Sequence, residues 1–154
     1  MTNKIITWIL FFLCTVAASS ITMVWSVGVD SWYKSLINPY SPAPWIFGPV
    51  WTTLYILIAT SAYRVMYARQ SEYKAMAMAL WSLQMVLNAL WTPIFFGAHN
   101  ILIALIFIVF LWITVFAYLY RSWFIDKISS IILWPYLAWL SFATFLNFTI
   151  WKLN

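Results

Sequence analysis

Tryptophan and amide side chains recur at helical spacing in the most apolar stretches of this sequence. Between residues 75 and 96, one face of a helix would carry four of them: Trp81, Gln84, Asn88 and Trp91. An amide in hydrocarbon needs a hydrogen-bond partner, so this face should not lie against lipid. Two interpretations fit equally well: hydrogen bonds that join neighbouring helices, or the polar part of a ligand-binding pocket.

Two further apolar stretches also place a tryptophan beside small or amide residues. Trp139 is followed at helical spacing by Ala143 and Asn147, and Trp51 lies beside a stripe of small residues. The stripe most simply indicates a close helix contact, and its members are Gly48, Thr52, Tyr55, Ala59 and Ala62. An indole offers a flat apolar face and one N–H donor. A cavity lined by several indoles would suit a large, flat, mostly apolar ligand with a few polar groups.

Conventional catalytic groups are missing from these apolar stretches. Asp30, Glu72 and Asp126 fall outside them, and no Lys, Arg or His lies near the middle of one. This argues against proton-coupled transport, and against hydrolysis by paired carboxylates, a triad or a metal. His99 is the single histidine, and we interpret it as a turn residue rather than an iron ligand. A conventional enzyme is therefore not expected, any chemistry would be radical or photo-oxidative, and no metal or required cofactor is predicted.

Composition indicates that these residues lie in a membrane. Of 154 residues, 66% are hydrophobic and 7% are charged, whereas a soluble domain carries about 25% charged residues. Several apolar runs reach the roughly 20 residues that a spanning helix needs. We predict an all-α membrane protein, a single domain built as a five-transmembrane-helix bundle, with spans at about 5–29, 45–67, 75–96, 101–120 and 128–151. The first run is longer than a typical signal-peptide core, so we take it as a retained span.

Two sequence features concern the connections and the last span. Residues 30–44 form the longest polar connection, in which three prolines forbid a continuous helix. Aromatic residues such as Tyr33 and Tyr40 suit either a belt at the membrane interface or a lid over a cavity between helices. Pro135 is expected to kink the last span.

Basic residues predict the orientation of the chain. Six of them flank one side of the predicted spans, namely Lys4, Arg64, Arg69, Lys74, Arg121 and Lys127. Lys34 and Lys152 flank the other side. The positive-inside rule then places the N-terminus in the cytoplasm, and the asymmetry favours a bacterial inner membrane. We interpret the cations as orientation signals and lipid-headgroup contacts, not as nucleic-acid contacts.

Three segments together resemble one known family: WYKSLINPYSPAPWIFGPVWTTLY (32–55), LNALWTPIFF (87–96) and PYLAWLSFATFLNFTIWKLN (135–154). In order, spacing and length the chain is similar to the tryptophan-rich sensory protein/translocator protein family (TspO/MBR, the peripheral-type benzodiazepine receptor family). The resemblance implies a five-helix bundle, usually a homodimer, with a pocket beneath the first loop. It also implies a membrane receptor or sensor for porphyrins such as protoporphyrin IX and haem, and for isoquinoline-carboxamide ligands. Transport and sequestration of the porphyrin are both open.

The resemblance assigns seven residues to ligand binding: Tyr33, Pro44, Trp51, Asn88, Trp91, Trp139 and Ala143. Tyr33 and Pro44 match lid residues, and Ala143 matches a small residue where a larger side chain would disturb helix packing. Trp51 and Trp139 match the tryptophans implicated in oxidative porphyrin breakdown in bacterial members. The alternative function is therefore an enzyme-like, light- and oxygen-dependent degradation of porphyrin with these two residues as the catalytic pair.

Two further expectations concern partners. The family's cholesterol motif has a tyrosine where this chain has Phe148, so cholesterol is not predicted as the ligand. A purely structural membrane partner is the third hypothesis, in which the tryptophan and amide faces serve only as helix contacts.

Overall fold

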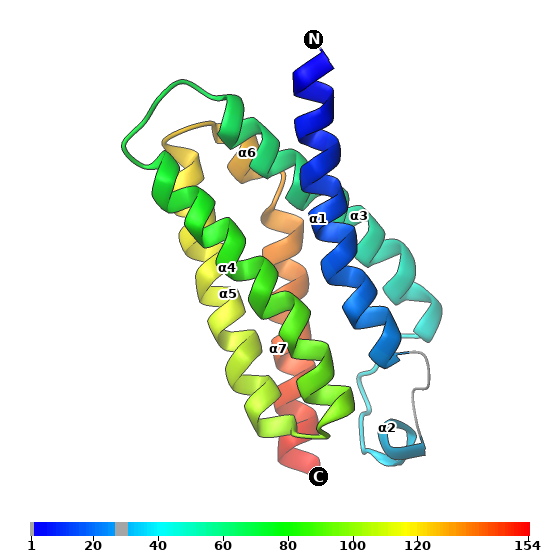
Figure 1. Ribbon diagram of the computed structural model, residues 1–154. Coiled ribbons are helices and arrows are strands. Elements are labelled where there is room, and N and C mark those ends of the chain that lie inside the picture. The colour runs from blue at the N-terminus through cyan, green and yellow to red at the C-terminus, as the bar shows by residue number, and fades with distance from the viewer. Residues whose placement is uncertain (1, 27–30) are drawn as a thin grey trace.

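The chain folds as a bundle of helices in a computed structural model that describes residues 2–26 and 31–154 (Figure 1). In this part of the chain all regular structure is helical. The α-helices are α1 (Thr2–Ser26), α2 (Ser31–Ser35), α3 (Pro44–Tyr67), α4 (Lys74–Thr92), α5 (Ile101–Trp123), α6 (Lys127–Ile131) and α7 (Trp134–Leu153). A π-helical turn, η1 (Pro93–Gly97), continues α4.

Four helical stretches of the described chain are long and apolar enough to cross a membrane: Pro44–Tyr67, Lys74–Gly97, Ile101–Trp123 and Lys127–Leu153. A shorter apolar stretch, Lys4–Ala17, lies in α1. The prediction of a helical membrane bundle is confirmed, whereas the fifth crossing stays a prediction. The end of the predicted first span and Asp30 lie outside the described residues. The two termini lie at opposite ends of the bundle (Figure 1).

Two groups of helices build the core. Helix α5 packs on α4 and α7, while α1 packs on α3 and α4. Fully buried apolar side chains meet between them, including Ile58 of α3, Leu111 of α5 and Leu140 of α7. The outward face of α5 is apolar as well, with Phe110 59% exposed. This is the surface expected of a protein whose surroundings are lipid.

The last predicted span is divided in the structure. A turn at Ile132 and Leu133 separates α6 from α7, and Pro135 lies in the first turn of α7. Proline is well tolerated there because the first N–H groups of a helix have no partner within the helix. The expected kink at Pro135 is therefore replaced by the start of a new helix.

The π-helical turn closes the end of α4. Pro93 supplies no backbone N–H, and its carbonyl accepts from the N–H of Ala98 at 2.9 Å. His99 follows with φ of 51°, in the left-handed region that tight reversals require. The Asn100 side chain then caps α5 by accepting from the N–H of Ile103 at 3.0 Å. His99 is thus the turn residue that its sequence context predicts.

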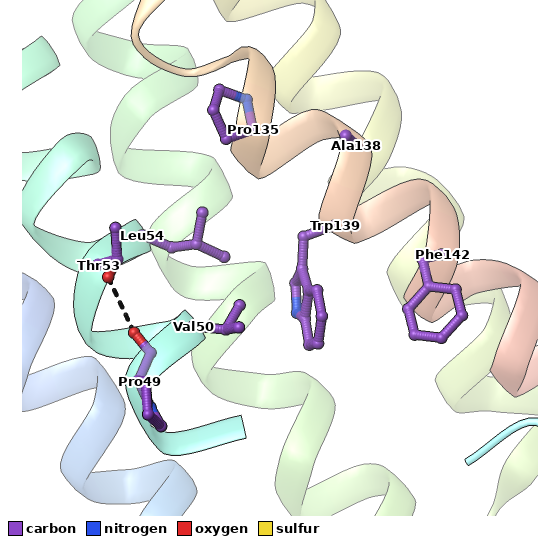
Figure 2. Close-up of a pocket in the computed structure, with 8 residues that line it drawn as sticks. All are labelled: Pro49, Val50, Thr53, Leu54, Pro135, Ala138, Trp139 and Phe142. Carbon is purple, nitrogen blue, oxygen red and sulfur yellow. Dashed lines mark hydrogen bonds between the residues drawn. The ribbon is translucent and has the colours of Figure 1, made fainter. Parts of the chain in front are cut away.

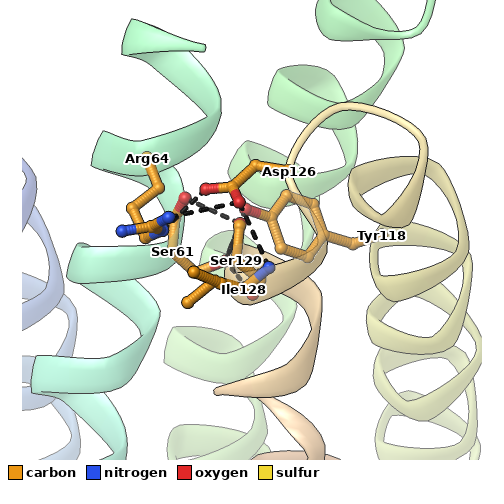
Figure 3. Close-up of polar contacts among 6 residues, drawn as sticks. All are labelled: Ser61, Arg64, Tyr118, Asp126, Ile128 and Ser129. Carbon is orange, nitrogen blue, oxygen red and sulfur yellow. Dashed lines mark hydrogen bonds and ion pairs between the residues drawn. The ribbon is translucent and has the colours of Figure 1, made fainter.

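A polar cluster ties α3, α5 and α6 together near the opposite end (Figure 3). The buried Ser61 hydroxyl shares hydrogen bonds with Tyr118 and Ser129, both at 2.8 Å. One turn along α3, Arg64 donates to both carboxylate oxygens of Asp126, at 2.6 and 3.2 Å. Asp126 also caps α6, because it accepts from the N–H of Ile128 at 3.1 Å. These contacts hold α6 against α3, and α7 begins after them.

Candidate functional site

An apolar groove of about 660 Å³ lies between α3 and α7 (Figure 2). Its lining residues are Pro49, Val50, Thr53, Leu54, Pro135, Ala138, Trp139 and Phe142. Thr53 brings the one hydroxyl of this set, and it donates to the carbonyl of Pro49 at 2.9 Å. The groove therefore offers a ligand a surface that is almost entirely carbon.

The packing of the helices explains why the groove exists. Helix α3 packs on α1, α4 and α6, whereas α7 packs on α5. Helix α6 packs on both α3 and α5 and ends at the turn at Ile132 and Leu133, after which α7 continues along α5. Pro49, Thr53 and Ala138 on the groove's rim are exposed, so the groove opens sideways from the bundle.

Trp139 is the large aromatic side chain at the centre of this groove. It projects from α7 into the space beside Val50 of α3 (Figure 2). Its ring contacts Phe47 and Phe142, with centroids 5.9 and 5.7 Å away. Within the part of the chain that the structure describes, the indole N–H has no hydrogen-bond acceptor. It can therefore donate to a ligand that lies against the indole face.

A buried hydrogen-bond network lies next to the groove and joins α3, α4 and α7. The Tyr55 hydroxyl donates to Oδ1 of Asn88 at 3.1 Å, and Nδ2 of Asn88 donates to the Tyr136 hydroxyl at 3.0 Å. Tyr136 donates in turn to Oε1 of Gln84 at 3.1 Å. In this structure the amide of Asn88 is engaged by protein side chains, which is the arrangement that interhelical hydrogen bonding requires.

Trp51 lies against the same network, outside the set of residues that line the groove. Its ring stacks on Tyr55 at 5.4 Å and meets Tyr136 edge-on at 6.4 Å. No acceptor for its indole N–H occurs among the described residues. Trp51 thus packs against the two buried tyrosines, Tyr55 and Tyr136.

Trp91 and Asn147 form a second interhelical contact, between α4 and α7. The indole of Trp91 donates to Oδ1 of Asn147 at 3.2 Å and stacks on Phe95 at 5.0 Å. Nδ2 of Asn147 donates to the carbonyl of Ile101 at 3.0 Å. Ala143, one turn before Asn147, is half-buried against the main core. Both amide faces predicted from the sequence therefore point between helices.

The connection before α3 covers the end of the bundle formed by η1. Tyr33 of α2 contacts Phe95 and Phe96, with ring centroids 6.1 and 5.4 Å away. Its hydroxyl accepts from Nδ2 of Asn38 at 3.1 Å. Pro44 is exposed at the start of α3. Of the predicted lid residues, Tyr33 thus lies over η1, and neither Tyr33 nor Pro44 is among the groove-lining residues.

Asn154 fastens this connection to α7. The N–H of Ile37 donates to Oδ1 of Asn154 at 2.9 Å, and Nδ2 of Asn154 donates to the carbonyl of Ile37 at 3.2 Å. A third bond from Nδ2 to the carbonyl of Ile150 holds the amide in place. The sequence contains no signal for this pairing, because the two partners are 117 positions apart.

Replacing Asn154 with alanine is expected to loosen the 31–43 connection. The two bonds to Ile37 would be lost, and each such bond contributes about 0.5–1.5 kcal/mol. We therefore expect amide hydrogen exchange in residues 31–43 to accelerate about fivefold or more, measured by mass spectrometry. Leu153→Ala, which changes an exposed neighbour, is the control and should leave this exchange unchanged. Equal exchange rates of residues 31–43 in the two variants would contradict the conclusion that Asn154 holds this connection against α7.

Among the seven predicted ligand-binding residues, only Trp139 lines the groove. Trp51 and Asn88 belong to the buried network beside it, whereas Tyr33, Trp91 and Ala143 pack elsewhere in the bundle and Pro44 is exposed. Sequence reasoning missed Val50, Leu54 and Phe142 as groove residues. Apolar residues on a helix face follow the same pattern whether they meet another helix, a groove or lipid, so periodicity could not have found them.

Comparison with known proteins places the chain among membrane proteins of one kind. The profile of the TspO/MBR family matches residues 6–152. Protein CrtK of Rhodobacter capsulatus is 38% identical over 146 residues, which cover 94% of this chain and 90% of that protein. The tryptophan-rich sensory protein of Cereibacter sphaeroides is 36% identical over 81% of this chain and 78% of its own length. The human translocator protein is 34% identical over 80% of this chain and 75% of its own length.

Proposed function

The chain belongs to the TspO/MBR family, and from this premise we propose that it is a membrane receptor or sensor for porphyrins and related flat apolar molecules. Protoporphyrin IX and haem are the proposed ligands, and the groove between α3 and α7 is the proposed binding site. Trp139 would form one aromatic wall, and α2 with the following connection would act as a lid at the nearby end of the bundle.

The observation that carries this proposal is the shape and chemistry of the groove. Its volume of about 660 Å³ falls within the roughly 300–1,000 Å³ of typical small-molecule sites. Val50 and Leu54 on one side face Trp139 and Phe142 on the other, which suits a planar ring system with two apolar faces. No lining residue is charged, so the carboxylates of a porphyrin would remain at the open side of the groove.

The ring contacts of Trp51 favour a second candidate function, the light-dependent oxidation of bound porphyrin by dioxygen. Trp51 stacks on Tyr55 and touches Tyr136, so three oxidisable rings lie together in the network next to the groove. Light absorbed by the porphyrin would supply the energy, dioxygen would be the oxidant, and Trp51 with Trp139 would exchange electrons with the excited ring. The groove lining holds no general base to activate its one hydroxyl, that of Thr53, so acid–base hydrolysis is not part of this candidate.

A titration with protoporphyrin IX, in the dark and under illumination, tests both functions. We expect saturable quenching of tryptophan fluorescence in the dark, at micromolar porphyrin. Loss of the porphyrin absorption spectrum in the light, abolished by Trp51→Phe or Trp139→Phe, would support degradation. Binding without such loss would support the sensor, and the absence of saturable quenching would overturn both.

A further inference from the structure

A basic and aromatic surface lies where α5 leads into α6, and it shares no residue with the groove's lining. We call it the α5–α6 surface, and its residues are Tyr73, Tyr120, Arg121, Trp123, Phe124 and Lys127. The guanidinium of Arg121 lies over the rings of Tyr73 and Tyr120, at 5.4 and 5.9 Å from their centroids. The Lys127 ammonium lies 5.5 Å over the Trp123 ring. These cation–π contacts hold two charges on aromatic faces at the end of the bundle.

Neither cation has a carboxylate partner within ion-pair distance in the described part of the chain, where the one ion pair joins Arg64 to Asp126. Asp126 precedes Lys127, yet both of its oxygens accept from Arg64. Glu72 is the other acidic group at this end, and its hydrogen bond to Tyr73 raises the pKa of that phenol. Two carboxylates thus face the six cations on this side of the predicted spans, and the surface remains positive.

The apolar residues beside these cations continue along the outside of α5. Tyr120 and Trp123 are three residues apart and so share a face of the helix. Ile113 and Phe116 are more than 45% exposed, and they extend this face toward the middle of the bundle at helical spacing. A positive end followed by an apolar stripe matches a molecule with an anionic head and a hydrocarbon tail.

We propose that the α5–α6 surface binds an anionic phospholipid, with the phosphate on Arg121 and Lys127 and an acyl chain along the stripe below Tyr120. A general positive surface would attract any anionic membrane, whereas two cations fixed on aromatic rings define one place for one headgroup. The lipid is distinct from the porphyrin of the proposed function, because its binding residues belong to neither α3 nor α7.

Native mass spectrometry of the purified protein, with phosphatidylglycerol or phosphatidylcholine added in equal amounts, tests this inference. Each basic residue near an anionic lipid surface contributes about fivefold in affinity. Arg121→Gln with Lys127→Gln should therefore lower phosphatidylglycerol retention at least about fivefold and leave phosphatidylcholine retention unchanged. The matched control, Lys34→Gln with Lys152→Gln, removes the same charge from the other end and should retain the lipid.

Further variants and a competition experiment test the same surface. Glu72→Gln removes a neighbouring negative charge and should increase phosphatidylglycerol retention. Equal loss in the Arg121/Lys127 and Lys34/Lys152 variants would overturn the proposal, because it would show a diffuse charge effect. Displacement of the lipid by millimolar inorganic phosphate would also overturn it, because the acyl chain would then contribute nothing.

Circular dichroism of each variant shows whether its helices are intact. The variant Arg121→Lys with Lys127→Arg keeps both charges and should retain the lipid.

Discussion

Replacing Trp139 with alanine is expected to lower the affinity for protoporphyrin IX by about ten- to a hundredfold. The substitution removes the aromatic wall at the centre of the groove and the indole N–H that has no acceptor in the described chain. Burying an aromatic side chain against a ligand contributes about 1.5–3 kcal/mol, and 1.4 kcal/mol corresponds to tenfold. The shift of the porphyrin absorption band on binding gives the dissociation constant without relying on the altered tryptophan fluorescence.

Trp134→Ala is the matched control for this prediction. Trp134 is in the same helix, is 53% exposed and is not among the groove-lining residues. Its replacement should leave porphyrin affinity within about twofold of the parent protein, since it removes the same side chain from a different surface. A similar loss of affinity in both variants, or none in Trp139→Ala, would show that the groove is not the porphyrin site.

Replacing Asn88 with alanine is expected to destabilise the bundle by about 1–3 kcal/mol. Two interhelical hydrogen bonds would disappear, and the Tyr55 hydroxyl would lose the acceptor it has in the buried network. Interhelical hydrogen bonds in membrane proteins contribute about 0.6–1.7 kcal/mol each, and the small cavity left by the amide adds to the loss. Unfolding in increasing sodium dodecyl sulfate, followed by the helical circular dichroism signal, measures this change.

The same variant distinguishes the two interpretations of the α4 amide face. If Asn88 serves mainly to join α3, α4 and α7, the porphyrin affinity of the folded variant should fall less than that of Trp139→Ala. A greater fall in affinity than in Trp139→Ala, with stability unchanged, would show that the amide contacts the ligand. Ser82→Ala on the exposed face of the same helix is the control, and it should change neither quantity.

Composition and periodicity were sufficient for the class of fold. A chain with so little charge and such long apolar runs has few alternatives to a helical membrane bundle, because backbone groups in lipid must be paired within each segment. The polar face of α4 could also be predicted, because Gln84 and Asn88 are spaced for one helix face. Both are buried in the structure. By contrast, the division between α6 and α7 lies within an unbroken apolar run, and Pro135 marks the place without revealing whether the helix bends or restarts.

The groove could be predicted only in part. The family resemblance identifies Trp139. Val50 and Phe142, in contrast, line the groove because α7 packs on α5 and a space remains between α7 and α3. Which helices pack on one another depends on the whole bundle and cannot be predicted from the sequence of a single helix. The paired hydrogen bonds between Asn154 and Ile37 could not be predicted either, since they depend on where two distant segments of the chain meet.

Because the groove opens sideways from the bundle, the affinity for a ligand refers to the ligand's concentration in the membrane, not in water. A flat apolar ligand would enter from the hydrocarbon around the bundle, where it concentrates far above its level in water. The occupancy of the site then follows the amount of ligand per lipid molecule. Diluting the same protein into more lipid or detergent should weaken the apparent binding in proportion, with every contact in the groove unchanged. In a cell, the occupancy of such a protein would report how much ligand is dissolved in the membrane around it.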